Sequence, residues 1–490
     1  MSHTEQEVIA RVAKKLYIDG KWLDAFDLAT FGVEDPSTGT ILTSVADAGP
    51  TDAIAALDSA SKAFDSWSTT APRARGEILR RAFEAIVQSA DYLSLLMTLE
   101  MGKPLAESRA EVIYAADFFR WFSEEAVRID GRYYQAPDGN SRVLTLKQAV
   151  GPAYLITPWN FPLAMATRKL GAALAAGCTV ILKPAEQTPL CSLALTQILI
   201  EAGLPDGVLN LILTSNPAVI TDTLFEHGGL RKLSFTGSTE VGKMLVAKSA
   251  GSLLKVSMEL GGNAPFLVFD DCDLDKAVDG AMVAKMRNMG EACTSANRFI
   301  VHSSVAEDFS QRLSQRMAAL SLGRGTEGEI AVGPLIDIDA IAKVQHLVLD
   351  AVAKGATVLT GGKRLGAQGY FFQPTVLLGV DSTSEITHKE IFGPVAPISI
   401  FSSELEAIQM ANATEYGLVA YVYTKDLSRA LRVIEQLDTG MIGLNQGMVS
   451  NAAAPFGGVK HSGFGREGGF EGIDEYLTVK YVAINHRTGL

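Results

Sequence analysis

The chain has 490 residues, of which 47% are hydrophobic and 20% charged, the composition of a globular protein long enough for about three domains of roughly 150 residues each. Its formal net charge of −12 and the lack of a basic stripe argue against a nucleic-acid-binding surface, because such a surface must displace cations from phosphates. An anionic small molecule stays open as a substrate, since a pocket needs only one or two local cations.

The four cysteines, Cys178, Cys191, Cys272 and Cys293, are too few for a disulfide scaffold, and no CxxC pair suggests a metal or redox motif. The first residues carry acids and no apolar core, so they do not resemble a targeting signal. The longest uncharged stretch, 148–167, holds three prolines, which disfavour a membrane-spanning helix. We therefore expect a soluble, cytoplasmic protein without membrane or nucleic-acid partners.

The first predicted elements are helices. Apolar residues at three- and four-residue spacing predict amphipathic helices over 51–64, 75–102 and 106–127. Residues 130–148 then carry two short strand-like runs separated by the turn PDGN at 137–140, which predicts a β-hairpin. Because such a hairpin has little core of its own, it would suit contact with a partner subunit.

Beyond the hairpin, apolar strands alternate with helices. Four strand and helix units in succession predict a parallel, doubly wound sheet, in which ligands lie beyond the carboxyl ends of the strands. The predicted pairs are 153–157 with 162–177, 179–184 with 190–203, 208–213 with 217–228, and 232–237 with 240–251. A second alternating region runs from 264 past 430, and the strand-like end at 472–485 offers a partner for the hairpin.

One G-x-G-x-x-G stretch, from Gly463 to Gly468, is interpreted as a tight or flexible loop and not as a dinucleotide site. That motif must follow a strand and open a helix, whereas GFGREG follows the polar, glycine-rich stretch PFGGVKHS. A nicotinamide cofactor is expected instead at the strand ends within 155–162, 181–189 and 233–242, where backbone N–H groups at a helix start can face a phosphate.

The stretch MGEACTSANR at 289–298 raises the question of whether Cys293 is a small core residue or a nucleophile. We interpret Cys178, Cys191 and Cys272 as core residues. The acidic neighbours of Cys272 would raise the pKa of its thiol and disfavour the thiolate.

Several motifs together occur in the order and spacing of the aldehyde dehydrogenase superfamily, which the chain resembles from 16–22 to 476–481. They are PWNFP (158–162), KPAEQTP (183–189), FTGSTEVG (235–242), MELGGNAP (258–265), GEAC (290–293), EIFGPV (390–395) and PFGGVKHSGFGREGG (455–469). The resemblance implies an α/β, aldehyde dehydrogenase fold that assembles as a homodimer or homotetramer. Its implied parts are a Rossmann-like NAD-binding domain (1–129 and 149–261), an α/β catalytic domain (262–460) and a small β-hairpin oligomerisation domain (130–148 and 461–490).

Oxidation of an aldehyde to an acid needs a nucleophile that first adds to the carbonyl, so that hydride can leave a tetrahedral carbon. The resemblance implies that Cys293 is this nucleophile and that the Asn160 amide and the Cys293 backbone N–H stabilise the oxyanion. It implies that Glu259 is the base that activates water to hydrolyse the thioester. From the residues alone, Asn160 also fits a turn or cap residue, and Glu259 a solvated strand-end acid.

The resemblance also implies the cofactor contacts. Lys183 and Glu186 would bond the adenosine ribose, and a carboxylate there would repel a 2′-phosphate, so NAD is preferred and NADP stays possible. Ser238 has a second interpretation as a plain helix N-cap. The implied cofactor-binding residues are Thr157, Pro158, Trp159, Lys183, Glu186, Gly237, Ser238, Leu260, Glu390 and Phe392.

Within the superfamily the chain resembles the succinate-semialdehyde dehydrogenases, which grip the distal carboxylate of the substrate with two arginines and a serine. Arg168, Arg287 and Ser450 fall on those positions, and a guanidinium suits a carboxylate because it can bind it bidentately. Succinate semialdehyde is therefore the expected substrate. Taken singly, each arginine also fits a solvated helix residue.

The alternative substrates are glutarate semialdehyde and uncharged aliphatic or aromatic aldehydes. A CoA-acylating relative would lack Glu259, and a non-catalytic relative would have lost Cys293, Glu259 or Asn160. No metal site is expected, because the seven histidines form no HxH or HExxH, and no GxSxG supports a serine hydrolase.

Two positions depart from many relatives, which read GQTCVC around the nucleophile. Ser295 replaces the second cysteine, so we expect no intramolecular disulfide switch at Cys293. Glu291 replaces glutamine, which leaves open a negative charge near the thiolate and its effect on the acidity of Cys293.

Overall fold

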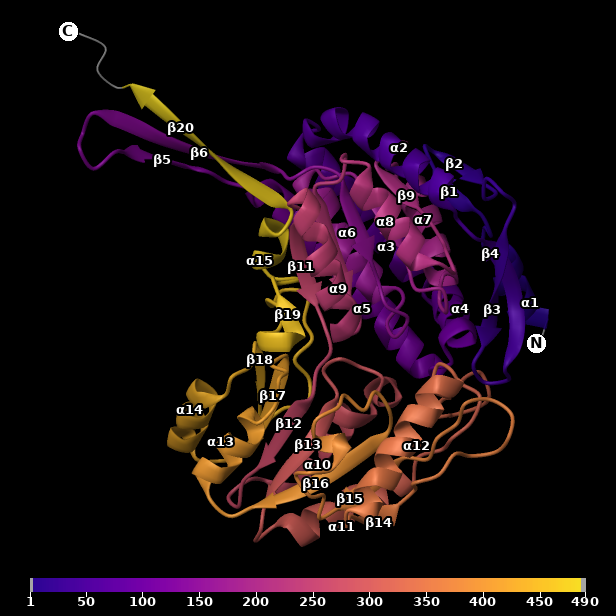
Figure 1. The fold of residues 1–490 in the computed structure, drawn as a ribbon, viewed down its shortest axis with the longest axis vertical. Coiled ribbons are helices and arrows are strands. Elements are labelled where there is room, and N and C mark those ends of the chain that lie inside the picture. The colour runs from indigo at the N-terminus through magenta and orange to yellow at the C-terminus, as the bar shows by residue number, and fades with distance from the viewer. Residues whose placement is uncertain (1–2, 486–490) are drawn as a thin grey trace.

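The computed structural model describes residues 3–485, whose strands form sheets of eight, seven, three and two strands. Figure 1 shows the two large sheets in separate halves of the molecule, with the three-stranded sheet projecting from the body as an arm.

The eight-stranded sheet has the order β19-β11-β10-β7-β8-β9-β1-β2. Its strands are β1 (Leu16–Ile18), β2 (Lys21–Leu23), β7 (Ala153–Ile156), β8 (Val180–Lys183), β9 (Leu209–Leu211), β10 (Lys232–Thr236), β11 (Lys255–Glu259) and β19 (Gly463–Phe464). The predicted parallel sheet is confirmed, because β9, β8, β7, β10 and β11 pair in parallel in that order. Every residue of β7, β8 and β10 is buried, as expected of strands that helices cover on both faces. The antiparallel edges β1, β2 and β19 were not predicted.

The helices of this half lie mainly where periodicity predicted them. They are α1 (His3–Arg11), α2 (Pro50–Ser68), α3 (Pro72–Gln88), α4 (Ala90–Met101), α5 (Leu105–Glu125), α6 (Ala164–Ala176), α7 (Leu190–Glu201), α8 (Pro217–Glu226) and α9 (Thr239–Ser249), with the 3₁₀ turns η1 (Ala126–Arg128) and η2 (Ala250–Ser252). The single helix predicted over 75–102 is wrong. Ser89, at φ −93° and ψ 14°, ends α3 and begins α4, so a serine that favours helix ends splits the run.

Helix α6 is buried over its whole length. Its small residues allow close packing: a Cβ added to Gly171 would lie 2.9 Å from a ring carbon of Phe122 in α5. Helix α5 therefore lies directly against α6, and side chains of α5 reach the residues that precede α6.

The seven-stranded sheet has the order β14-β15-β16-β13-β12-β17-β18, with only β14 antiparallel. Its strands are β12 (Ala264–Val268), β13 (Ala296–His302), β14 (Thr357–Thr360), β15 (Thr375–Leu378), β16 (Val395–Phe401), β17 (Val419–Tyr423) and β18 (Met441–Leu444). Beyond this sheet the chain forms η5 (Lys460–Ser462) and α15 (Glu471–Asp474), and α15 packs against α6. The helices that accompany the seven-stranded sheet are α10 (Leu274–Met286), α11 (Ala306–Ala318), α12 (Ile338–Ala353), α13 (Glu404–Asn412) and α14 (Leu427–Gln436), with η3 (Arg287–Gly290) and η4 (Glu385–Thr387). This is the predicted second alternating region.

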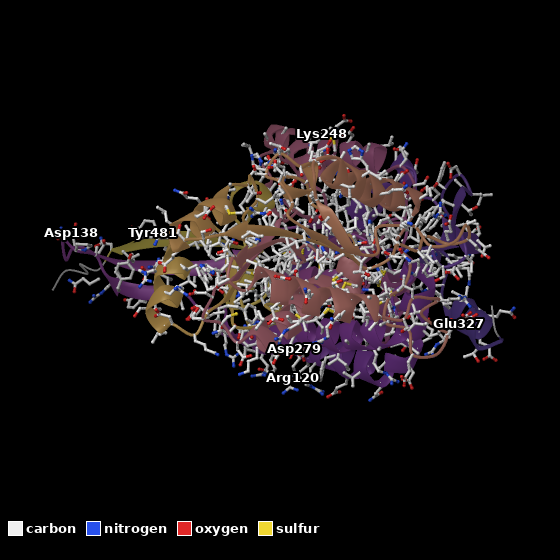
Figure 2. All side chains as sticks on the ribbon, turned by 90° about the horizontal axis from the view of Figure 1, so that it is seen from below. Arg120, Asp138, Lys248, Asp279, Glu327 and Tyr481 are labelled. Carbon is white, nitrogen blue, oxygen red and sulfur yellow. The ribbon has the colours of Figure 1, made fainter. Side chains whose placement is uncertain are left out.

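The arm consists of β5 (Arg132–Gln135), β6 (Ser141–Ala149) and β20 (Leu477–Asn485), paired antiparallel in the order β20-β6-β5. The predicted hairpin and its pairing with the last strand are confirmed, although that strand begins at Leu477 because residues 471–474 form α15. Figure 2 shows Asp138 at the tip of the arm and Tyr481 along it. A separate hairpin of β3 (Thr30–Asp35) and β4 (Thr40–Ala46) lies near α1 (Figure 1).

The domain limits stay a prediction. The segment 461–490 assigned to oligomerisation contributes β19 to the eight-stranded sheet and β20 to the arm.

Candidate active site

Cys293 lies between η3 and β13, on a turn built by left-handed residues. Asn288, Met289 and Gly290 have φ of 52°, 56° and 80°. A Cβ added to Gly262 would lie 2.4 Å from the carbonyl oxygen of Cys293, so the segment between the two large sheets packs tightly on the turn. The turn thus has a fixed shape and leaves Cys293 partly exposed.

Burial raises the pKa of the Cys293 thiol well above its usual value. The Glu259 carboxylate raises this pKa further, and the Arg168 guanidinium opposes the rise. The resting residue is therefore a thiol that must lose its proton before it can attack, so a neighbouring base is needed.

Glu259 supplies a suitable base at the carboxyl end of β11. Its side chain is buried, and both carboxylate oxygens have no hydrogen-bond partner among the described residues. Burial raises the pKa of Glu259 to about 7, with Glu467 adding to the rise and Arg168 opposing it. A carboxyl with a pKa near neutrality and free oxygens fits a general base.

Asn160 follows β7 and turns its side chain toward the segment that carries Cys293. Its Nδ2 donates to the carbonyl oxygen of Glu291 at 3.0 Å, and its Oδ1 accepts from the backbone N–H of Phe161 at 3.1 Å. The amide orientation is therefore fixed, and the second Nδ2 hydrogen is left for an oxyanion.

The surroundings of Glu291 disfavour the negative charge that its sequence position leaves open. The Glu291 side chain is fully buried, and its Oε1 accepts from the backbone N–H of Ile336 at 3.1 Å. Burial raises the pKa of Glu291 well above its usual value, which favours the neutral carboxyl.

Ser295, at the place of the second cysteine, accepts a hydrogen bond from Lys285 Nζ at 3.1 Å. All four cysteines are unpaired in the described residues, and the absence of a disulfide switch stays a prediction.

A cleft of about 330 Å³ opens at the strand ends of the eight-stranded sheet, between β7, β8 and α9. Seven of the ten predicted cofactor residues line it: Thr157, Pro158, Trp159, Lys183, Glu186, Gly237 and Ser238. Within the described residues, the buried hydroxyls of Thr157 and Thr236 have no partner, and both residues line the cleft. The cleft thus offers unused polar groups beside the start of α9, which fits a dinucleotide.

The other three predicted cofactor residues lie between this cleft and Cys293. The Phe392 ring packs edge-on against Trp159, with ring centroids 5.3 Å apart. Glu390 Oε1 accepts from the backbone N–H of Gly262 at 2.9 Å, and Leu260 packs against Gly242 of α9.

The two predicted substrate arginines both contact Tyr114: the Arg287 guanidinium lies 5.5 Å from its ring centroid, and Arg168 donates to its hydroxyl. Arg287 Nη1 donates to Ser450 Oγ at 3.2 Å, and the guanidinium lies 4.8 Å from the ring centroid of Phe161, the residue after Asn160. Arg168 is buried instead, where it donates to Glu467 Oε2 at 3.2 Å and to the Tyr114 hydroxyl at 2.7 Å. Arg168 Nε has no partner among the described residues, and a contact of Arg168 with substrate stays a prediction.

Several functional neighbours were missed from the sequence. Glu467, which pairs with Arg168 and Lys169, comes from the GFGREG loop, where Gly463, Gly465 and Gly468 have positive φ and no helix follows directly. The available signal was the pair Arg168 and Lys169 inside an otherwise apolar helix, which requires a buried partner. The missed polar residues around the site are Lys103, Glu111, Tyr114, Lys169, Lys285, Asn288 and Glu467.

The chain belongs to the aldehyde dehydrogenase family, whose model matches residues 22–482. The protein is therefore an oxidoreductase of the aldehyde dehydrogenase class.

Named relatives are close. The chain is 56% identical to a succinate-semialdehyde dehydrogenase of Paenarthrobacter nicotinovorans over 91% of this chain and 99% of that protein. It is 48% identical to a glutarate-semialdehyde dehydrogenase of Pseudomonas putida, over 96% of this chain and 98% of that one. The crystal structure of an Escherichia coli NADP-dependent enzyme matches with a TM-score of 0.95 and 47% identity, covering 97% of this chain and 98% of that chain.

Among residues 3–485, no helix has the length and apolar character needed to cross a membrane. In the same residues, histidine, cysteine and carboxylate side chains form no cluster that could hold a metal ion.

Proposed function

We propose that this enzyme oxidises an aldehyde that carries a distal carboxylate, succinate semialdehyde above all, to the acid with NAD as oxidant. The observation that carries the proposal is the Arg287–Ser450 pair beside Phe161, next to the Asn160 and Cys293 segments. Both curated relatives described above are named for semialdehydes of dicarboxylic acids.

Catalysis begins when the Cys293 sulfur adds to the aldehyde carbon. The Glu259 carboxylate takes the thiol proton, and the free Nδ2 hydrogen of Asn160 stabilises the oxyanion of the resulting thiohemiacetal. NAD, held in the cleft beside the start of α9, would supply the hydride acceptor for oxidation of the thiohemiacetal to a thioester. Glu259 releases the thiol proton to solvent and, as a carboxylate again, takes a proton from the water that hydrolyses the thioester. The Cys293 thiolate is the leaving group and is reprotonated as the acid product is released.

Arg287 and Ser450 would hold the distal carboxylate of the substrate. A guanidinium and a hydroxyl are both donors, and they already lie within hydrogen-bond distance of each other. A carboxylate placed between them receives charge-assisted hydrogen bonds, which an uncharged chain end cannot replace.

The test is steady-state kinetics of Arg287→Gln on succinate semialdehyde and on butanal. We expect kcat/KM for succinate semialdehyde to fall about 10- to 100-fold, as for the loss of a hydrogen bond to a charged group, with kcat/KM for butanal unchanged. The matched control is Arg109→Gln, because Arg109 lines the outer part of the groove that contains Arg287 and is exposed. Equal losses on both aldehydes would contradict the proposal.

Glutarate semialdehyde is a second candidate, favoured by the relative of that name. A higher kcat/KM on the five-carbon semialdehyde than on the four-carbon one would select it.

We propose NAD over NADP as the preferred cofactor because of Glu186. Glu186 Oε2 lies 3.5 Å from Lys183 Nζ in the cleft, so the lysine charge is already balanced and a 2′-phosphate would meet a carboxylate.

We propose that the arm joins subunits into a homodimer or homotetramer. Exposed apolar side chains support this, since Tyr133, Val479 and Tyr481 are 60 to 65% exposed along the three-stranded sheet. Light scattering of the purified chain and of a Tyr133→Glu/Tyr481→Glu variant would measure the change of mass. We also propose that the protein is located in the cytoplasm. Its four unpaired cysteines support this, because a reducing compartment keeps thiols free.

A further inference from the structure

A buried ammonium contacts the backbone of the proposed oxyanion residue. Lys103 follows α4, and its side chain is 1% exposed. Lys103 Nζ donates to the carbonyl oxygen of Asn160 at 2.7 Å and to Glu111 Oε2 at 2.5 Å, and it lies 4.2 Å from the ring centroid of Phe161. Burial of an ammonium is unfavourable unless partners compensate its charge and satisfy its donors, and these three contacts do so.

Glu111 connects the same ammonium to the start of α6. Its Oε1 accepts from the backbone N–H groups of Leu163 and Ala164, at 3.0 and 3.1 Å. Leu163 is the N-cap residue of α6 and offers no side-chain cap of its own. The Lys103–Glu111 pair therefore holds residues 160–164 at two points, a carbonyl at one end and two N–H groups at the other.

A third contact joins this segment to the nucleophile turn. Asn288 Nδ2 donates to the carbonyl oxygens of both Asn160 and Glu291, at 3.0 and 2.8 Å. The Asn160 carbonyl oxygen thus accepts from Lys103 on one side and Asn288 on the other, which fixes the plane of that peptide. Because the Asn160 side chain projects from the same residue, its amide direction depends on this plane.

We propose that Lys103 is a positioning residue for the oxyanion site: it fixes the Asn160 backbone, so that the Asn160 amide points at the carbon bound to Cys293. This inference rests on the proposed role of Asn160. Lys103 itself does not touch the reacting atoms, and its effect on the reaction passes through Asn160.

The test is a double-variant cycle of Lys103→Met and Asn160→Ala, followed by kcat at saturating aldehyde and NAD. We expect Asn160→Ala to lower kcat about 10²- to 10³-fold and Lys103→Met about 10²-fold, as for a catalytic group displaced by about 1 Å. The double variant should be no slower than Asn160→Ala alone, and KM for NAD should be unchanged. The kinetic isotope effect with 1-deuterated aldehyde should not rise in Lys103→Met, since the steps that need the oxyanion donor, thiol addition and thioester hydrolysis, break no C–H bond.

Two further variants separate positioning from loss of a buried charge. Lys232→Met removes an equally buried ammonium, whose partners are Ser257 and Glu475, and should keep kcat. Where Lys103→Met does not fold, Lys103→Met/Glu111→Gln replaces it, because glutamine still accepts from the start of α6 and leaves no unpaired carboxylate.

Losses that multiply in the double variant, or an equal loss in Lys232→Met, would overturn the role of Lys103 and leave that of Asn160 intact. Full kcat in Asn160→Ala would instead overturn the proposed oxyanion role, and the positioning role with it.

Discussion

Helices α6 and α9 both follow parallel strands of the eight-stranded sheet, yet their N-termini differ. The start of α6 is closed by the buried Glu111 carboxylate, and α7 is closed in the same way by Glu100, which accepts from Leu190 and Cys191 at 2.6 and 2.9 Å. The start of α9 is capped only by its own Ser238 hydroxyl, at 3.3 Å from the Val241 nitrogen, and faces the cleft.

The difference explains where an anionic cofactor can bind. A helix N-terminus attracts one anion, and in α6 and α7 a protein carboxylate already takes that place. Only α9 of these three keeps its first turn available for a pyrophosphate. The two closed starts have their backbone N–H groups fixed by buried carboxylates, and the open one suits an anionic ligand.

Loss of the proposed base Glu259 should have the largest effect of the substitutions considered. Glu259→Gln should lower kcat about 10³-fold and should also slow the single-turnover formation of NADH at 340 nm, because both the attack of the Cys293 thiol and the hydrolysis of the thioester lose their base. The Kd for NAD should not change, since Glu259 does not line the cleft. Weaker NAD binding by Glu259→Gln would contradict the separation of the proposed base from the cofactor cleft.

The pH dependence of kcat provides a second test of Glu259 as the base. The pKa of Glu259 is raised to about 7 by burial, and the active form of a base is the carboxylate. The kcat of the unmodified enzyme should therefore rise with pH and level off above about pH 7, and Glu259→Gln should lose this limb.

Removing a buried cap should cost more stability than removing the open one. Glu111→Ala leaves the Lys103 ammonium buried and unpaired, so the free energy of unfolding should fall by about 3–5 kcal/mol. Ser238→Ala should cost about 1 kcal/mol, as for an ordinary N-cap. Urea unfolding of both variants measures this, and equal losses would contradict the distinction.

A substitution confined to the cofactor cleft should alter only the preference for NAD over NADP. Glu186→Ser removes the carboxylate that faces a 2′-phosphate and frees Lys183, so the NAD to NADP ratio of kcat/KM should fall about 10-fold, as expected for one lost repulsion of about 1.4 kcal/mol. Glu240→Gln, a matched loss of one acid in the first turn of α9, should leave the ratio unchanged.

The sequence predicted what depends on local pattern. The four strand and helix units, the hairpin and the cleft residues at the strand ends follow from short apolar runs and from motifs at their ends. The break at Ser89 was missed, because apolar periodicity continues across it. The raised pKa of Glu291 and the contacts of Lys103 and Glu111 could not be predicted, since each depends on burial between segments far apart in the chain.

Full burial of α6 also has an evolutionary consequence. A helix whose thirteen residues are all buried accepts few substitutions without a loss of packing, so Asn160 and its supports are expected to change slowly. Arg287 begins η3 and Ser450 lies in an irregular segment, and both are half-exposed. With the proposed roles, new substrate preferences can arise at these two positions by single replacements, while Asn160 and its supports stay unchanged.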